Sequence, residues 1–190
     1  MRNFKILKMN VKIHPSSEVY TTQIGDGTII WQNCVILKGS IIGKNCNINF
    51  NVFIENDVII GDNVTVKSGV QLWDGLRIGN NVFIGPNATF TNDLIPRSKI
   101  YPESFEKTII EEGASVGANA TIIAGNIIGK YALIGAGSVL TKAAPSFTVW
   151  YGNPAKKQGY ITRTGIVLDI ELVDKAGRKY KLKEGEPILA

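Results

Sequence analysis

The side chains best suited to chemistry lie beside one stretch of the chain that does not repeat. Asn92 and Asp93 stand together in the phrase FTND, just before a segment that contains two prolines. An amide carbonyl such as that of Asn92 can orient an amine nucleophile, and the Asp93 carboxylate can accept a proton. The one histidine, His14, precedes Pro15 at an expected bend, which favours a structural role. A hydroxyl nucleophile needs a positioned base, whereas a neutral, oriented amine attacks directly, so this set favours chemistry on an amine.

Both residues also have a simpler interpretation, which stays open at this point. Asn92 suits a turn where a loop leaves a regular element, and Asp93 suits a solvated position on such a loop. The choice between these interpretations depends on the elements that position the two side chains.

A six-residue repeat precedes and follows this stretch. Apolar residues recur at every sixth position from Ile24 to Phe90, and again in a shifted phase from Ile110 to Leu140. A period of six fits neither a helix nor an alternating strand, and it indicates a parallel β-helix with three hexapeptides to a triangular coil. Residues eighteen apart then stack about 4.8 Å from one another. This stacking predicts two columns of turn residues. One is glycine, at Gly25, Gly43, Gly61 and Gly79, and the other is asparagine in left-handed backbone angles, at Asn45, Asn63 and Asn81.

The predicted fold class is therefore all-β, with a left-handed parallel β-helix of hexapeptide repeats, one protruding loop at about residues 92–109 and a C-terminal β-hairpin tail. Residues 1–12 are expected to form a cap or arm. The tail alternates around residues 174–177, which predicts the hairpin turn there. We expect two units, a β-helix domain over residues 1–160 and a C-terminal extension over residues 161–190.

Composition sets few further bounds on function. The 190 residues are 44% hydrophobic and 19% charged, without a long apolar run, which predicts a cytoplasmic protein without a membrane partner. The net charge of +5 comes without a nucleic-acid-binding motif, so we expect no nucleic-acid partner. Cys34 and Cys46 both occupy the fifth place of a hexapeptide, where small apolar residues also stand, so packing is favoured over a disulfide or a metal site.

The phrases around the loop carry a family resemblance. They are VKSGVQLWDG, VFIGPNATFTND, PRSK, PESFEKT, GASVGANATI, IGAGSVLTK and GNPAK. Over about residues 11–160 the chain resembles the left-handed β-helix acyltransferases of the hexapeptide-repeat superfamily, and within them the N-acetyltransferases of nucleotide-linked 3-amino sugars. The resemblance implies a homotrimer with sites between subunits, acetyl-CoA as cosubstrate, a nucleotide-sugar substrate and no required metal. Outward-facing Trp31 suits such a subunit contact.

The resemblance and the residue chemistry together suggest roles for named positions. Asn92 is expected to be catalytic, with Asp93 as the alternative base. The nucleotide sugar is expected to contact Arg97 and Lys99 through its diphosphate, Tyr101 through its base, and also Trp73 and Glu55. Acetyl-CoA is expected along a groove of small residues and nearby lysines, formed by Gly117, Ala118, Ala120, Gly135, Ala136, Lys142, Asn153, Pro154 and Lys156. β-Helix corners favour glycine and alanine in any case, and each lysine also suits a solvated position.

The expected reaction is acetylation of the 3-amino group of a dTDP-3-amino-3,6-dideoxyhexose, for a surface polysaccharide or glycan precursor. The alternative acceptor is UDP-2-acetamido-3-amino-2,3-dideoxyglucuronate, which is disfavoured because no carboxylate-clamping cluster is visible. An O-acetyltransferase and a non-catalytic β-solenoid are further alternatives. A carbonic anhydrase on this fold needs three histidines on zinc, and one histidine excludes it.

Overall fold

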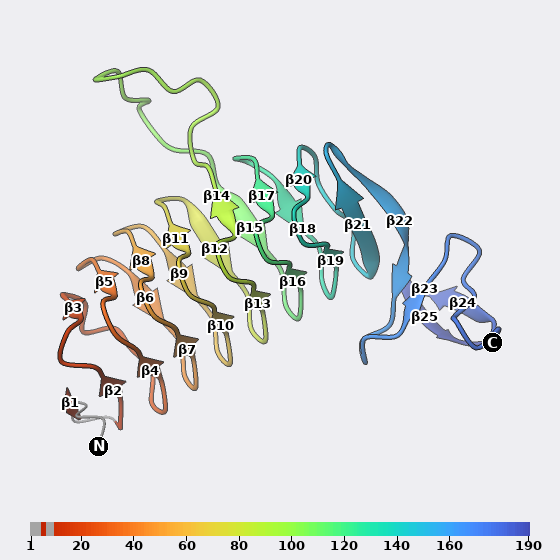
Figure 1. Cartoon of the computed structure of the whole chain (residues 1–190), viewed down its shortest axis with the longest axis horizontal. Coiled ribbons are helices and arrows are strands. Elements are labelled where there is room, and N and C mark those ends of the chain that lie inside the picture. Colours follow the sequence, from red (N-terminus) through yellow and green to blue (C-terminus); the bar gives the residue numbers. More distant parts are fainter. Residues whose placement is uncertain (1–4, 7–9) are drawn as a thin grey trace.

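Short parallel strands wind into a triangular solenoid with three long sheets (Figure 1). The computed structural model describes residues 5–6 and 10–190, so most of the predicted cap at residues 1–12 lies outside the described residues. Within that range no helix occurs, and so none is long and apolar enough to cross a membrane. The all-β class and the parallel β-helix predicted from the six-residue repeat are confirmed.

Each sheet collects one strand from every coil. The first sheet contains β1 (Lys5–Ile6), β2 (Lys12–Ile13), β4 (Ile29–Ile30), β7 (Asn47–Ile48), β10 (Thr65–Val66), β13 (Phe83–Ile84), β16 (Ser115–Val116), β19 (Leu133–Ile134), β21 (Thr148–Gly152), β22 (Ala155–Ile161) and β23 (Val167–Leu168). The second contains β3 (Glu18–Val19), β5 (Val35–Ile36), β8 (Phe53–Ile54), β11 (Gln71–Leu72), β14 (Thr89–Phe90), β17 (Thr121–Ile122) and β20 (Val139–Leu140). The third contains β6 (Ile41–Ile42), β9 (Ile59–Ile60), β12 (Leu76–Ile78), β15 (Thr108–Ile110) and β18 (Ile127–Ile128).

The core is the column of aliphatic side chains that the repeat predicted. Every sixth residue from Ile24 to Phe90, and from Ile110 to Leu140, is at most 4% exposed. Each such side chain contributes roughly 1.5–3 kcal/mol when it is fully buried. Cys34 and Cys46 are free and buried in the same core, where burial raises the pKa of both thiols, so the packing interpretation is confirmed.

The two predicted columns of turn residues together make one corner of the triangle, where the chain passes from the third sheet to the first. Asn45, Asn63 and Asn81 have φ of 54°, 57° and 59°, the left-handed angles expected of asparagine. A Cβ added to Gly25 would lie 2.6 Å from the carbonyl carbon of Gly43, so this column needs glycine because of close approach. Below, the first corner joins the first sheet to the second, the second corner joins the second to the third, and the third corner joins the third to the first.

One loop interrupts the coils between β14 and β15 and projects from the solenoid (Figure 1). Arg77 pairs with Ile109, 32 residues later, where a regular coil pairs residues 18 apart, so the loop adds 14 residues. Fourteen exceeds two hexapeptides by two, which explains the shifted phase of the repeat. The predicted protruding loop is thus confirmed, over residues 91–107.

The C-terminal tail contains the predicted hairpin turn and a second hairpin. A tight turn forms at residues 174–177, where the Asp174 amide donates to the Arg178 carbonyl, and beyond the Val173–Lys179 bridge the Tyr180 amide donates to the Leu172 carbonyl. The regular hairpin is the next one along, between β24 (Tyr180–Lys183) and β25 (Glu186–Leu189). The predicted turn and its antiparallel pairing are confirmed, and the Asp174 carboxylate stabilises the turn by accepting backbone hydrogen bonds from Ala176 and Arg178.

A cluster of side chains joins this extension to the third corner. The rings of Tyr131 and Phe147 stack with centroids 5.3 Å apart, and both residues hold left-handed backbone angles, with φ of 56° and 58°. The Arg163 guanidinium lies 4.5 Å from the Tyr131 ring centroid and donates to the Tyr131 hydroxyl at 3.0 Å. It also pairs with Glu186 at 2.8 Å. We call Tyr131, Phe147, Arg163 and Glu186 the latch.

Candidate active site

The loop leaves the second corner and returns to it through a closed base. The backbone amide of Glu106 donates to the carbonyl of Asn92 at 3.1 Å, so both ends of the loop meet at Asn92. Gly75, one coil earlier, has φ of 90°, and an added Cβ there would lie 2.6 Å from the Glu106 carbonyl oxygen. The coil therefore fixes where the loop begins, although it does not fix the loop's interior.

A cavity of about 360 Å³ lies inside the loop. Its lining combines carboxylates, amides and apolar side chains, from Asn92, Asp93, Leu94, Ile95, Ile100, Tyr101, Pro102, Ser104 and Glu106. The structure thus brings together three of the predicted site residues, Asn92, Asp93 and Tyr101. Asp93 also accepts a hydrogen bond from the Ile95 amide at 2.8 Å, so its carboxylate has a role in the loop's own turn.

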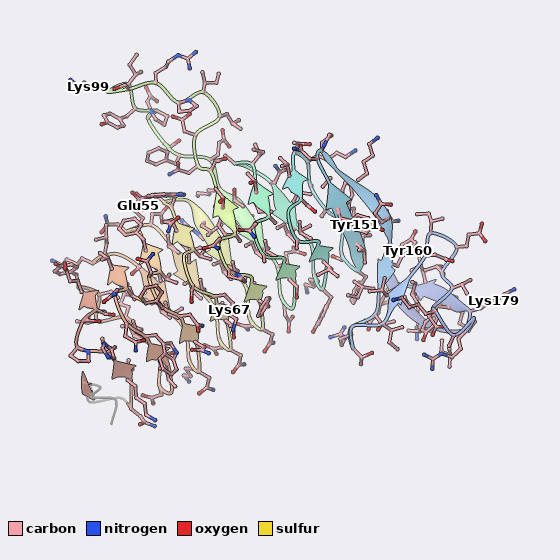
Figure 2. All side chains as sticks on the ribbon, in the orientation of Figure 1. Glu55, Lys67, Lys99, Tyr151, Tyr160 and Lys179 are labelled. Atoms are coloured by element: carbon pink, nitrogen blue, oxygen red, sulfur yellow. The ribbon has the colours of Figure 1, made fainter. Side chains whose placement is uncertain are left out.

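The two predicted diphosphate ligands lie elsewhere on the loop. Arg97 and Lys99 are exposed at its tip, outside the lining of the cavity, and Figure 2 shows Lys99 far from the solenoid. Arg97 donates to the carbonyl of its neighbour Pro96 at 2.9 Å. Lys99 has a φ of 62°, in the left-handed region.

Glu55 and Trp73 stack on successive coils at the second corner, at the solenoid edge beneath the loop (Figure 2). The Glu55 carboxylate accepts the Asp74 backbone amide at 2.7 Å, and the Asp74 carboxylate accepts the Asp57 amide at 2.6 Å. Burial, followed by the nearby Asp74 charge, raises the pKa of Glu55 against the lowering effect of that hydrogen bond. Trp73 packs on Phe53, with ring centroids 5.4 Å apart.

Asp74 is a residue that the sequence reasoning missed. Thr89 pairs with Gln71 on the adjacent coil, so Asn92 stacks on Asp74, which lies eighteen residues earlier. The eighteen-residue spacing that identified Glu55 and Trp73 also connects these two residues. Applied to Asn92, it would have placed a carboxylate one coil, about 4.8 Å, away.

The predicted groove of small residues lies at the first corner. An added Cβ on Gly117 would be 2.7 Å from the carbonyl carbon of Gly135, and one on Gly85 would be 2.6 Å from the amide of Ala118, so this column stacks backbone on backbone. Ala118 and Ala136 are accessible beside it. Ala120 instead is fully buried in the core, so its side chain does not reach a groove.

The remaining predicted cofactor residues lie at the C-terminal end of the coils. Asn153 and Pro154 form the exposed tip between β21 and β22, joined by a cis peptide bond. Lys142 and Lys156 are exposed, and the Lys142 ammonium lies 5.5 Å from the Trp150 ring centroid. Asn153, Pro154 and Lys156 follow the first-corner column, whereas Lys142 directly follows β20 at the second corner, two coils beyond Asn92.

Within one chain the loop residues and the predicted cofactor residues other than Lys142 therefore occupy different corners. Figure 2 shows Lys67 and Tyr151 along the edge of the first sheet and Glu55 at the edge from which the loop leaves. His14 lies near the N-terminal end, where its Nδ1 is 2.9 Å from the Ser16 hydroxyl. The loop cavity lies at the second corner and the column of small residues lies at the first, so no single corner contains both.

Comparison with known proteins identifies the family. The bacterial transferase hexapeptide family, defined by six repeats, matches residues 21–56, 57–92 and 107–142, which together exceed half of the chain. This chain belongs to that family. A hexapeptide repeat of succinyl-transferase also matches this hexapeptide transferase at residues 39–74.

One curated relative is much more similar in sequence than the solved structures below. The dTDP-3-amino-3,6-dideoxy-alpha-D-galactopyranose 3-N-acetyltransferase of Aneurinibacillus thermoaerophilus is 53% identical over 87 residues, covering 44% of this chain and 45% of the relative. This hexapeptide transferase thus matches less than half the length of that relative.

Two solved structures share the fold at lower identity. PerB from Caulobacter crescentus, in complex with CoA and GDP-perosamine, is 23% identical with a TM-score of 0.57, over 78% of this chain and 57% of that one. A variant of AntD, an N-acyltransferase from Bacillus cereus in complex with dTDP and coenzyme A, is 18% identical with a TM-score of 0.61, over 82% and 83%. At these identities the similarity shows the fold alone.

Proposed function

We propose that this hexapeptide transferase is an acetyl-CoA-dependent N-acetyltransferase that acylates the 3-amino group of a dTDP-3-amino-3,6-dideoxyhexose. The single observation that carries the proposal is the 53% identity to a relative named for that reaction. The loop cavity supports it, because Asn92, Asp93 and Tyr101 line one space beside the solenoid.

The chain's residues suit attack by an amine. The Asn92 side chain makes no hydrogen bond to any other described residue, so its carbonyl is available to accept an N–H of the substrate. Carboxylates at Asp93 and Glu106 favour binding of a cationic amine, and one of them accepts the proton that the amine must lose. The neutral amine then attacks the thioester carbonyl, the carbon–sulfur bond breaks, and the CoA thiolate leaves and takes up a proton. Backbone amides at the first corner are the candidate donors to the oxyanion.

The assembly is part of the proposal. A homotrimer with parallel solenoids would set the second corner of one subunit against the first corner of its neighbour. This arrangement is needed because one chain keeps the loop cavity and the column of small residues at different corners. Sedimentation that finds a monomer at micromolar concentration would contradict it.

The uronate alternative has less support. A substrate carboxylate calls for a cationic partner, and the cavity lining contains Asp93 and Glu106 but neither Arg97 nor Lys99. The 6-deoxy sugar places no charge there. We therefore retain the dTDP-linked 6-deoxy acceptor, in cytoplasmic synthesis of a glycan precursor.

Acceptor specificity tests the function directly. Purified protein is incubated with acetyl-CoA and a panel of nucleotide sugars while free thiol is followed. We expect turnover with the dTDP-linked 3-amino sugar, slower turnover with the UDP-linked amino uronate, and binding without turnover for the 3-hydroxy analogue. Equal rates for the amino and hydroxy sugars would refute the argument that the site favours an amine over a hydroxyl.

A further inference from the structure

Three carboxylates lie next to Asn92 at the base of the loop. Asp93 follows Asn92 in the chain, and Asp74 stacks one coil below it. Glu106 closes the base from the returning end of the loop, where its amide donates to the Asn92 carbonyl at 3.1 Å. Each is a candidate to contact an amine that binds at Asn92, and the three differ in what their oxygens already bind.

Two of these carboxylates hold the protein's own backbone. Oδ1 of Asp93 accepts the Ile95 amide at 2.8 Å, and Oδ1 of Asp74 accepts the Asp57 amide at 2.6 Å. Hydrogen bonds of this kind orient an aspartate toward the turn that it stabilises. Asp74 also lies outside the lining of the loop cavity. Both groups therefore have a structural role that Glu106 does not share.

The Glu106 carboxylate forms no hydrogen bond or ion pair with any residue that the structure describes. Its backbone, by contrast, is fixed relative to Asn92 through the bond that closes the loop. Both residues line the loop cavity. The chain thus holds this carboxylate beside Asn92 while leaving both of its oxygens available to a substrate.

The Glu106 side chain points along the solenoid toward the coil that follows the loop. A Cβ added to Gly125, at the second corner of that coil, would lie 3.3 Å from Glu106 Oε2. The first corner of the same coil carries Gly117, in the column of small residues where the acyl donor is expected. Along the solenoid axis the carboxylate therefore lies on the donor side of Asn92.

No lysine or arginine in the described part of the chain pairs with Glu106. Lys107 follows it and is exposed. Lys142 stacks two coils beyond Asn92, with its ammonium 5.5 Å from the Trp150 ring centroid. An unpaired carboxylate in this position suits a substrate group that carries positive charge or donates an N–H.

Amide formation creates such a group after the amine has attacked. The neutral amine forms the carbon–nitrogen bond, and the tetrahedral intermediate then carries a positively charged nitrogen that must lose a proton. We propose that Glu106 is the base that accepts this proton. The carbon–sulfur bond then breaks, the CoA thiolate leaves with the electron pair, and the proton passes from Glu106 to the thiolate, which restores the carboxylate. The inference rests on the proposed N-acetylation and assigns this step to Glu106 rather than to Asp93.

This assignment gives the acceptor preference a physical cause. A carboxylate is a weak base, strong enough for the acidic N–H of the charged intermediate but too weak to activate a sugar hydroxyl. His14, the one imidazole, lies near the N-terminal end of the solenoid. A site that relies on Glu106 should therefore acylate the amine and leave the hydroxyl analogue unreacted.

Steady-state kinetics of the full chain test the assignment with acetyl-CoA and the dTDP-linked 3-amino sugar. Glu106→Gln keeps the size of the side chain but cannot accept the proton, so kcat should fall roughly 100- to 10,000-fold, the range for loss of a general base. KM should stay near the wild-type value because binding contacts remain. Glu103→Gln is the matched control, since Glu103 is exposed on the same loop outside the cavity lining, and it should match wild type.

Chemical rescue separates a base from a structural residue. Glu106→Ala leaves space in an open cavity, so added formate should restore turnover in proportion to its concentration by taking the place of the missing carboxylate. Asp93→Ala, tested in parallel, should show no such restoration because its carboxylate holds the Ile95 amide. Circular dichroism of each variant checks that the coils are intact.

The outcomes distinguish this inference from the proposed function. Wild-type kcat in Glu106→Gln would overturn the inference, as would a loss of activity in Glu106→Ala that formate does not restore. Rescue of Asp93→Ala instead of Glu106→Ala would return the base to Asp93. If the wild-type protein turns over none of the nucleotide-linked amino sugars, the proposed function fails instead.

Discussion

The regular coils and the loop at residues 91–107 differ in what determines the position of a side chain. In the coils, parallel pairing at eighteen-residue intervals fixes whether a residue faces the core, a corner or solvent, so Glu55 and Trp73 stack as their spacing requires. In the loop only the base is tied to the coils, through Asn92 and Glu106. Substitutions in the coils should therefore change mainly stability, whereas substitutions at the loop base should change mainly activity.

The largest effect on stability should come from the centre of the coils. Ile54 is fully buried, and Ile54→Ala removes its methyl groups and leaves a cavity, which should lower the free energy of unfolding by about 2–5 kcal/mol. Urea denaturation followed by circular dichroism measures the change. Ile59→Ala is the matched control. Ile59 is 40% exposed on the same coil, so this substitution should lower the free energy of unfolding much less.

A smaller effect is expected at the corners. Asn63 has a φ of 57°, so Asn63→Ala should cost about 1–2 kcal/mol of stability, whereas Asn63→Gly should be nearly neutral. The same denaturation assay compares the two variants. Equal losses for alanine and glycine would show that the asparagine side chain, rather than its backbone angle, determines the corner.

The smallest effect on stability is its pH dependence, which comes from Glu55 at the second corner. Burial raises the pKa of Glu55 in the folded state above its unfolded value, so the folded state binds a proton more readily, and stability falls as pH rises between those two values. Glu55→Gln keeps an acceptor for the Asp74 amide but does not titrate. The variant should therefore gain stability relative to wild type from pH 4 to pH 7, as measured by denaturation at each pH. A stability difference that is constant across this range would contradict the burial argument.

Most of the coil structure could be predicted from the sequence because a single period determines it. The aliphatic positions, the asparagines in left-handed angles and the loop's location all follow from stacking every eighteenth residue. The same register also places Asp74 beside Asn92, a relation between coils that the loop's own sequence does not indicate.

The loop interior and the C-terminal extension could not be predicted in the same way. Arg97 and Lys99 suit a diphosphate by their chemistry, yet local backbone contacts at the tip leave them outside the cavity. In the extension, the turn at residues 174–177 forms where the alternation suggested, but the longer antiparallel ladder lies in the next hairpin, between β24 and β25. The latch depends on contacts between residues far apart in sequence, such as Tyr131 and Arg163, which no local pattern indicates.

The kinetics of Asn92→Ala test the central claim, that the base of the loop carries the chemistry, most directly. The side chain is not part of the core, so the variant should keep wild-type stability while kcat/KM for the amino-sugar acceptor falls by roughly 30- to 1000-fold, the loss of about 2–4 kcal/mol of transition-state contact. His14→Ala, measured in parallel, should be nearly silent. Wild-type turnover in Asn92→Ala, together with loss of turnover in a well-folded His14→Ala, would move the chemistry to the other end of the solenoid and contradict this account.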